Sequence, residues 1–380
     1  MIDAPGPWGT GPFTLVEGAS SLHNEIAVMR AEPFACAWLP AAELRSDRVV
    51  LEANRDHWNV ERGPRLERVV FRNDLSPPEA LELCLSGEGE VDVVTELTPD
   101  VAARVEASQH AELVSLEANR VLVGIVNRFA PDVPLADQRA REAINLAVDV
   151  DRLVEVGFAG HATPLAGLTP SWAAGYPGAA RQAGHDPARA RELLAEAGWP
   201  AGRALRLAAP EALEPVARFL AGEIVAALGT VGVEVTVVPE AALLAGSRQL
   251  VEKKVVPPWD VLLHAWFDLS SDAPPATVHR EFFGADGAFR AGPELPEFDR
   301  LFAEFKATAD PGRQSEVAAE IDRLVQREAL ALFLVNPHAL YAVNRHVRFS
   351  AYRSTLELAE TEVDEGHWSL RATREPVLAG

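Results

Sequence analysis

Apolar residues recur at helical spacing in several stretches of the chain. The clearest stretch opens at Asp186 and Pro187, because an aspartate can cap a helix whose first position suits proline, and Gly198 ends it. Its apolar stripe consists of Ala190, Leu193, Leu194 and Ala197. The same reasoning predicts helices over residues 78–85, 137–147, 149–158, 187–197, 215–228, 298–305 and 312–327.

Short runs of β-branched and other apolar residues, bounded by turn residues, predict strands. They lie at 49–52, 68–72, 89–94, 121–127, 205–208, 231–238, 259–266, 332–335 and 339–343. The run 121–127 is almost continuously apolar, which predicts a strand buried on both faces. Because strands and helices alternate along the chain, the sequence predicts an α/β fold with helices layered on a sheet.

Composition and charge narrow the class of partner. With 380 residues, of which 48% are hydrophobic and 24% charged, the chain has the make-up of a globular protein of two or three domains. The 56 acidic and 35 basic side chains leave a net charge of −21. Nucleic acids and anionic membrane surfaces need a basic patch, so neither is an expected partner.

Cysteine content and the chain ends bear on redox state and location. Cys36 and Cys84 belong to no Cys-x-x-Cys motif, which argues against structural zinc and leaves a single disulfide open. The apolar run 329–335 is far shorter than the roughly 20 residues that cross a bilayer, so the chain is not expected to insert into a membrane. The first residues lack the features of a signal peptide. The chain as written is therefore expected in the cytoplasm, or outside it if the chain is a shortened form of an exported protein.

Five landmarks follow one another in a definite order. The first is a pair of motifs, Gly-Thr-Gly-Pro-Phe at 9–13 followed by Leu-Glu-Ala-Asn-Arg-Asp-His-Trp at 51–58. In the second, a proline and an aspartate at 134 and 137 precede Arg-Ala-Arg-Glu-Ala-Ile-Asn. The others are the helix opening at His185, the strand 259–266 and the ending 332–345. Together they resemble the family 5 extracellular solute-binding proteins, the oligopeptide-, dipeptide- and nickel-binding group of ABC importers.

The resemblance implies a two-lobed, periplasmic-binding-protein-like fold of type II, with the ligand enclosed between the lobes. Lobe I would comprise 1–125 plus 341–380 and lobe II 126–340, with hinge strands near 121–127 and 335–341. Family members carry about 150 further residues, the size of a domain, before the first motif. Lobe I is therefore expected to be incomplete, lacking this N-terminal extra domain. The segment near 18–48 is longer than the family pattern and is interpreted as an insertion.

The resemblance also suggests which residues contact the ligand. Peptide-binding relatives pair the ligand's amino group with an aspartate three positions after the strand tryptophan, but Leu269 occupies that position here. Asp268 and Asp272 are the nearest carboxylates, and turn capping is their alternative role. Trp266 offers a stacking face or else belongs to the core. The candidate ligand contacts are Trp266, Phe267, Asp268, Asp272, Asn127, His264, Tyr176 and Trp172.

The remaining candidates also have structural alternatives. Asn127 would offer its amide to the ligand or cap the hinge, and Tyr176 and Trp172 would line the cleft rim. The ten histidines include no His-Glu-x-x-His motif, so no metal site is predicted. No nucleophile elbow, phosphate loop or dinucleotide fingerprint occurs, so no catalytic residue and no cofactor are predicted. The pair Asp268 and Asp272, or Glu281 with His279, could serve as acid and base, but any cleft offers such pairs.

These observations predict a ligand-binding protein that encloses a small organic or peptide-like molecule. If the protein is exported, an ABC permease is a further expected partner. A second copy of the chain, in a homodimer, would cover strand edges left open by an incomplete lobe. The alternative is a cytoplasmic enzyme or ligand sensor that has co-opted the same scaffold, because a fold alone does not fix function.

Overall fold

The computed structural model describes residues 9–18, 20–23, 39–178, 184–210, 216–239, 258–266, 276–287, 290–351, 353 and 358–374. They form two compact units. The described residues of the larger unit all lie within Glu117–His338. The smaller unit comprises those within Met1–Glu25, Ala37–Leu116 and Ala339–Gly380. The chain passes between the units after Leu116 and again after His338.

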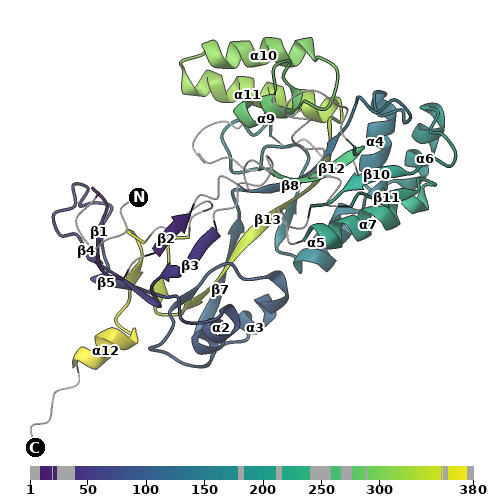
Figure 1. The fold of residues 1–380 in the computed structure, drawn as a ribbon. Coiled ribbons are helices and arrows are strands. Elements are labelled where there is room, and N and C mark those ends of the chain that lie inside the picture. Colours follow the sequence, from purple (N-terminus) through teal and green to yellow (C-terminus); the bar gives the residue numbers. More distant parts are fainter. Residues whose placement is uncertain are drawn as a thin grey trace, which may run out of the picture. The chain divides into compact units, whose positions relative to one another are not determined.

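A mixed sheet forms the centre of the larger unit (Figure 1). Its strands lie in the order β11 (Val235–Val237), β10 (Leu205–Ala208), β12 (Val261–Trp266), β8 (Val121–Val126) and β13 (Ala331–Asn344). The short strand β9 (Ala162–Pro164) also pairs with β13. Strand β10 runs parallel to both neighbours, whereas β12, β8 and β13 pair antiparallel.

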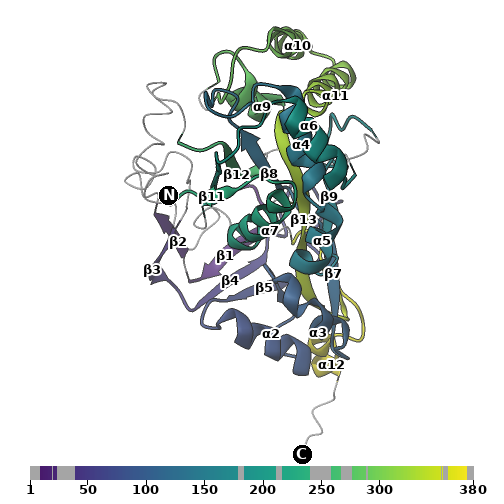
Figure 2. The same cartoon turned by 90° about the vertical axis from the view of Figure 1, so that its right-hand side faces the viewer.

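Helices cover both faces of this sheet (Figures 1 and 2). Leu122 and Val126 of β8 pack on the side of α4 (Gln138–Ala147), α5 (Val150–Phe158), α6 (Pro187–Glu196) and α7 (Ala217–Thr230). Val121, Val123 and Ile125 pack on the side of α9 (Ala276–Phe283), α10 (Pro296–Ala307) and α11 (Pro311–Arg327). Alternate residues of a strand point to opposite faces. The prediction that this strand is buried on both faces is therefore confirmed.

The smaller unit contains several short strands and helices. The antiparallel sheet is β1 (Phe13–Glu17), β4 (Arg48–Ala53) and β5 (Arg68–Arg72), and β2 (Ser20–His23) pairs with β3 (Leu39–Arg45) within the predicted insertion. The end of β13 pairs with β6 (Val93–Val94) and β7 (Ala111–Glu117). The remaining elements are α2 (Pro77–Ser86), η1 (Pro99–Val101), α3 (Ala102–Glu106), β14 (Val347–Arg348), β15 (Glu362–Val363) and α12 (Trp368–Arg374).

Three of the predicted helix starts agree with the structure. The side chains of Asp137, Asp149 and Asp186 each accept a hydrogen bond from a backbone N–H of the first turn, as N-caps do.

Two predicted strands are too long. The run 89–94 yields only Val93–Val94, and 231–238 yields only Val235–Val237. Gly89 and Gly232 have φ angles of +102° and +84°, outside the strand region, so neither glycine belongs to a strand.

Strand β13 is also continuous, where the sequence suggested two strands. Pro337, which lacks an N–H group, sits within it opposite Ala162.

Cys84 is buried, and this burial raises the pKa of its thiol to about 12. Cys36 lies outside the described residues, so the open question of a disulfide stays as it was. Across the described ranges, no helix combines the length and the apolar character needed to cross a membrane.

Candidate functional site

Four predicted ligand contacts follow or end β12. The register sets Trp266 opposite Val121, at the first position of β8. The structure describes the backbone of Trp266 but not its side chain, and Phe267, Asp268 and Asp272 lie outside the described residues. The ligand contacts of these four residues therefore stay a prediction.

His264 lies on the same strand, and its ring contacts an aromatic side chain. The ring centre is 5.2 Å from that of Phe282 on α9. Burial lowers the pKa of His264 to about 4, because the imidazolium would lose its hydration there. At neutral pH His264 is therefore an uncharged imidazole.

Acidification is expected to destabilise the fold through His264. Because its folded pKa lies below the ordinary value near 6.5, the unfolded chain binds the proton more tightly. Its contribution to stability is complete above about pH 6.5 and is lost as the pH falls toward 4. Urea unfolding at pH 7.5 and 5.0 should show a loss of about 2 kcal/mol from this group, and His264→Gln should abolish that part.

The matched control is His185→Gln, because the side chain of His185 is 40% exposed. This variant should keep the pH dependence of the wild type. An unchanged pH dependence in His264→Gln would contradict the burial argument.

Asn127 uses its amide within the chain. Its Nδ2 donates to the carbonyl of Trp259 at 2.8 Å, and its Oδ1 accepts from the N–H of Phe129 at 3.0 Å. The residue is fully buried. These bonds stabilise the turn after β8, which supports the capping role among the two alternatives.

The proline-rich loop that carries Trp172 and Tyr176 is anchored within the larger unit. Trp172 Nε1 donates to Oδ1 of the buried Asn336 at 3.4 Å, and Ser171 Oγ donates to Glu117 at 2.8 Å. Tyr176 is 37% exposed. Of the two aromatic candidates in this loop, Trp172 is therefore engaged in the structure and Tyr176 is the more accessible.

Two histidines lie close to this anchor. The ring centres of His161 and His338 are 6.4 Å apart, and His338 Nε2 lies 3.2 Å from Thr163 Oγ1. Burial lowers the pKa of His338, with Glu117 opposing the change and His161 adding to it. The pair therefore favours the uncharged form of His338.

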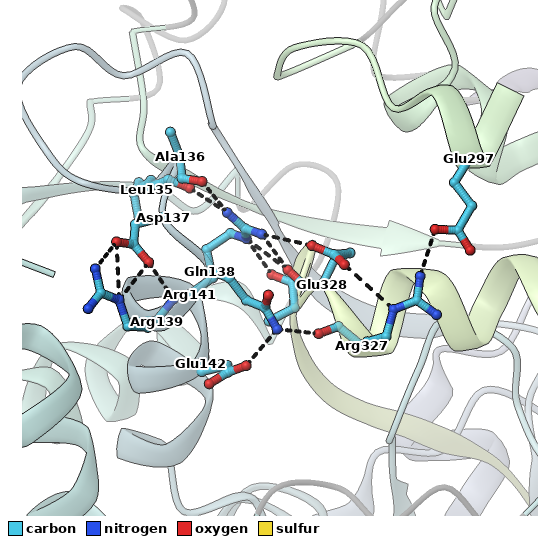
Figure 3. A network of polar contacts seen from close by, with 11 residues as sticks. Leu135, Ala136, Asp137, Gln138, Arg139, Arg141, Glu142, Glu297, Arg327 and Glu328 are labelled. Carbon is cyan, nitrogen blue, oxygen red and sulfur yellow. Dashed lines mark hydrogen bonds and ion pairs between the residues drawn. The ribbon is translucent and has the colours of Figure 1, made fainter. Parts of the chain in front are cut away.

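A buried arginine holds the start of α4 against the end of α11 (Figure 3). The Arg141 side chain is 4% exposed and donates to the carbonyls of Leu135, Ala136, Glu328 and Ala329. Burial lowers the pKa of Arg141, and the four backbone carbonyls stabilise its positively charged guanidinium. The residue belongs to the 134–149 landmark, but the sequence suggested no role for it.

A cavity of about 350 Å³ lies beside the edge of β13. Its lining residues are Glu142, Asn145, Leu146, Ala166, Gln326, Ala329 and Phe333. Asn145 donates to the carbonyl of Ala331 and accepts from the N–H of Phe333, so its amide takes the place of a paired strand. Glu142 accepts from Gln138 Nε2 at 2.7 Å.

His279 and Glu281, which the sequence offered as one acid–base combination, each pair with another residue in the structure. His279 Nε2 lies 3.3 Å from Asp322 Oδ1, and the buried carboxylate also accepts two backbone N–H groups of the proline-rich loop. Glu281 instead forms an ion pair with Arg280 at 2.6 Å. The His279–Asp322 pair therefore holds a loop. In the part of the chain that the structure describes, no group of three or more His, Cys, Asp and Glu side chains is arranged to hold a metal ion.

The fold is that of a solute-binding protein over most of the chain. The family model for bacterial extracellular solute-binding proteins, family 5 Middle, matches residues 3–284. The chain therefore belongs to family 5 of the bacterial extracellular solute-binding proteins, and the family resemblance found in the sequence is confirmed.

Solved structures agree with this fold. HbpA2 from Haemophilus parasuis gives a TM-score of 0.73 at 19% identity. The match covers 84% of this chain and 62% of the HbpA2 chain. NikA from Brucella suis, solved with Fe(III)-EDTA, gives 0.71 at 18% identity, covering 94% of this chain and 68% of its own. At these identities the likeness concerns the fold.

A curated relative matches over a shorter stretch. The glutathione-binding protein GsiB of Escherichia coli strain K12 is 26% identical over 196 residues. The match covers 52% of this chain and 32% of GsiB, so it spans about a third of that relative.

Proposed function

We propose that the protein binds a small organic or peptide-like molecule between two lobes, as the ligand-binding component of an ABC importer. The observation that carries the proposal is the match of the family model to residues 3–284 of the 380. GsiB is named for glutathione, and the NikA structure contains Fe(III)-EDTA, which supports a small polar ligand.

The proposed lobes are 1–125 plus 341–380 and 126–340, with ligand contacts after β12. Trp266 would supply a stacking face, and Asp268 or Asp272 a carboxylate for a ligand amino group. Tyr176 would add a contact, because it is partly exposed on an anchored loop. An ABC permease is the partner that this function implies for an exported protein.

The test is ligand-dependent thermal unfolding followed by calorimetric titration. The probes are glutathione, di- and tripeptides with free or acetylated amino groups, and iron–EDTA. A ligand that binds the folded state raises the melting temperature by mass action. We expect Trp266→Ala to weaken binding about tenfold or more, because aromatic anchors dominate such contacts.

The control for Trp266→Ala is Trp58→Ala, because Trp58 is 75% exposed. It should leave affinity unchanged. Loss of binding in Asp268→Asn or Asp272→Asn, only for peptides with a free amino group, would identify the carboxylate. If none of the probes binds, and native mass spectrometry of the purified protein shows no bound solute, the proposal is wrong.

A further inference from the structure

Arg128 carries a buried charge that the described residues do not compensate. The residue follows β8 directly, and only 7% of its surface is exposed. Its Nη2 is enclosed without a hydrogen-bond partner, and its guanidinium makes no hydrogen bond or ion pair within the described ranges. A buried guanidinium without an acceptor is strongly unfavourable, so its charge calls for an explanation.

The surroundings of Arg128 hold the guanidinium in place. Its backbone N–H donates to the carbonyl of Ala291 at 2.7 Å. Gly292 lies directly against the guanidinium, since a Cβ there would come within 2.4 Å of Arg128 Cζ. A larger residue at 292 would displace the charged group, so the segment after α9 forms a close-fitting wall for it.

A second arginine, Arg290, lies in the same segment after α9. The guanidinium carbon of Arg290 lies 6.0 Å from the ring centre of Phe129, the residue after Arg128. Arg290 Nη1 is 3.5 Å from Glu294 Oε1, an ion pair, yet it has no hydrogen-bond partner. Two guanidinium groups with free N–H donors therefore lie near one another.

Two other arginines lie close enough to disfavour the charge of Arg128. Burial, together with Arg141 and Arg290, lowers the pKa of Arg128 to about 10, and Glu328 opposes this change. The guanidinium of Arg128 therefore stays charged at pH 7.

Arg141 shows what a structural buried arginine looks like in the same unit. Four backbone carbonyls surround its guanidinium (Figure 3), whereas none accepts from Arg128 in the described part of the chain. Arg128 therefore differs from a guanidinium whose role is to join backbone segments. The acceptor it lacks would be supplied by a bound anion.

Arg128 lies at the other end of β8 from Trp266, and Asn127, the candidate ligand contact beside it, uses its amide within the chain. Trp266 pairs with Val121 at one end of β8, and Arg128 lies two residues past Val126 at the other end. A strand of this length spans about 17 Å.

We infer that Arg128 and Arg290 form a binding site for a small oxyanion, a phosphate or a carboxylate. Two oxygens of such an anion match the paired N–H groups of a guanidinium. Binding gives the unpartnered N–H groups of Arg128 and Arg290 an acceptor and stabilises the larger unit. This inference does not rest on the proposed function.

The test compares the thermal unfolding of matched variants in potassium phosphate, potassium acetate and potassium chloride at equal ionic strength. In wild type we expect phosphate or acetate to raise the melting temperature in a saturable way, and calorimetry to give about one anion per chain. Arg128→Gln should weaken this binding about tenfold to a hundredfold, as the loss of charge-assisted hydrogen bonds predicts. Arg139→Gln removes the same charge from a side chain that is 47% exposed, and it should keep the wild-type response.

A second variant keeps the test decisive if Arg128→Gln does not fold. Gly292→Ala keeps both charges but places a Cβ against the guanidinium, so it should weaken anion binding. In chloride, Arg128→Gln should be at least as stable as wild type, because it removes an uncompensated charge. Equal responses to all three salts in wild type, or an undiminished phosphate and acetate response in Arg128→Gln, would overturn the inference.

Discussion

Replacing Asp260 with alanine is expected to lower the free energy of unfolding of the larger unit by about 4 kcal/mol. The Asp260 carboxylate is fully buried and accepts from Arg203, from the Arg206 side chain and from the backbone N–H of Arg206. Removing it leaves two guanidinium groups without their buried counter-charge. Urea unfolding followed by circular dichroism measures the loss.

Asp132 provides the matched control for Asp260. It pairs with the same Arg203 at 2.7 Å, but its side chain is 54% exposed. An exposed ion pair contributes little, so Asp132→Ala should cost less than about 1 kcal/mol. Similar losses in the two variants would show that burial does not set the strength of these ion pairs.

Replacing Arg141 with methionine is expected to have an effect of similar size, a loss of about 4 kcal/mol. Methionine fills part of the space but leaves the carbonyls of Leu135, Ala136, Glu328 and Ala329 without a buried donor. The start of α4 and the end of α11 lose their connection. The measurement is thermal and urea unfolding, with hydrogen exchange expected to rise in both segments.

Arg139→Met is the control for Arg141→Met. Arg139 lies on the same helix and pairs with Asp137, but nearly half of its side chain is exposed. Its replacement should change stability by less than about 1 kcal/mol. A loss in Arg139→Met that matches the loss in Arg141→Met would rule out the carbonyl network as the cause.

Local signals in the sequence predicted most of the helices and the central strand. The caps at Asp137, Asp149 and Asp186 act within one helical turn, so the pattern alone locates them. Strand β9 was missed because its three residues have no period of their own and depend on pairing with β13, far along the chain.

The polar network was hidden from the sequence for the same reason. Arg141 stands next to an apolar stripe, and its acceptors at 328 and 329 lie 187 and 188 residues away. Asp260 resembled any polar residue at the start of a strand, because its partners lie 54 and 57 positions before it. The sequence shows only that a charged residue interrupts an apolar pattern. It does not show which distant residue that charge pairs with.

The candidate site was also only partly accessible to prediction. The family resemblance selected Trp266, Phe267, Asp268 and Asp272, and the side chains of these residues lie outside the described part of the chain. The cavity beside β13 had no sequence signal, because α4, residue 166 and the end of α11 meet only in the folded unit.

The path of the chain through the two units sets an order for folding during synthesis. The smaller unit needs Ala342 of β13 to pair with Val94, whereas the described residues of the larger unit all lie within Glu117–His338. Domains fold as their residues leave the ribosome. The larger unit can therefore complete its fold first. The strands of the smaller unit are synthesised earlier, but they complete their sheet only after Ala342 has been made.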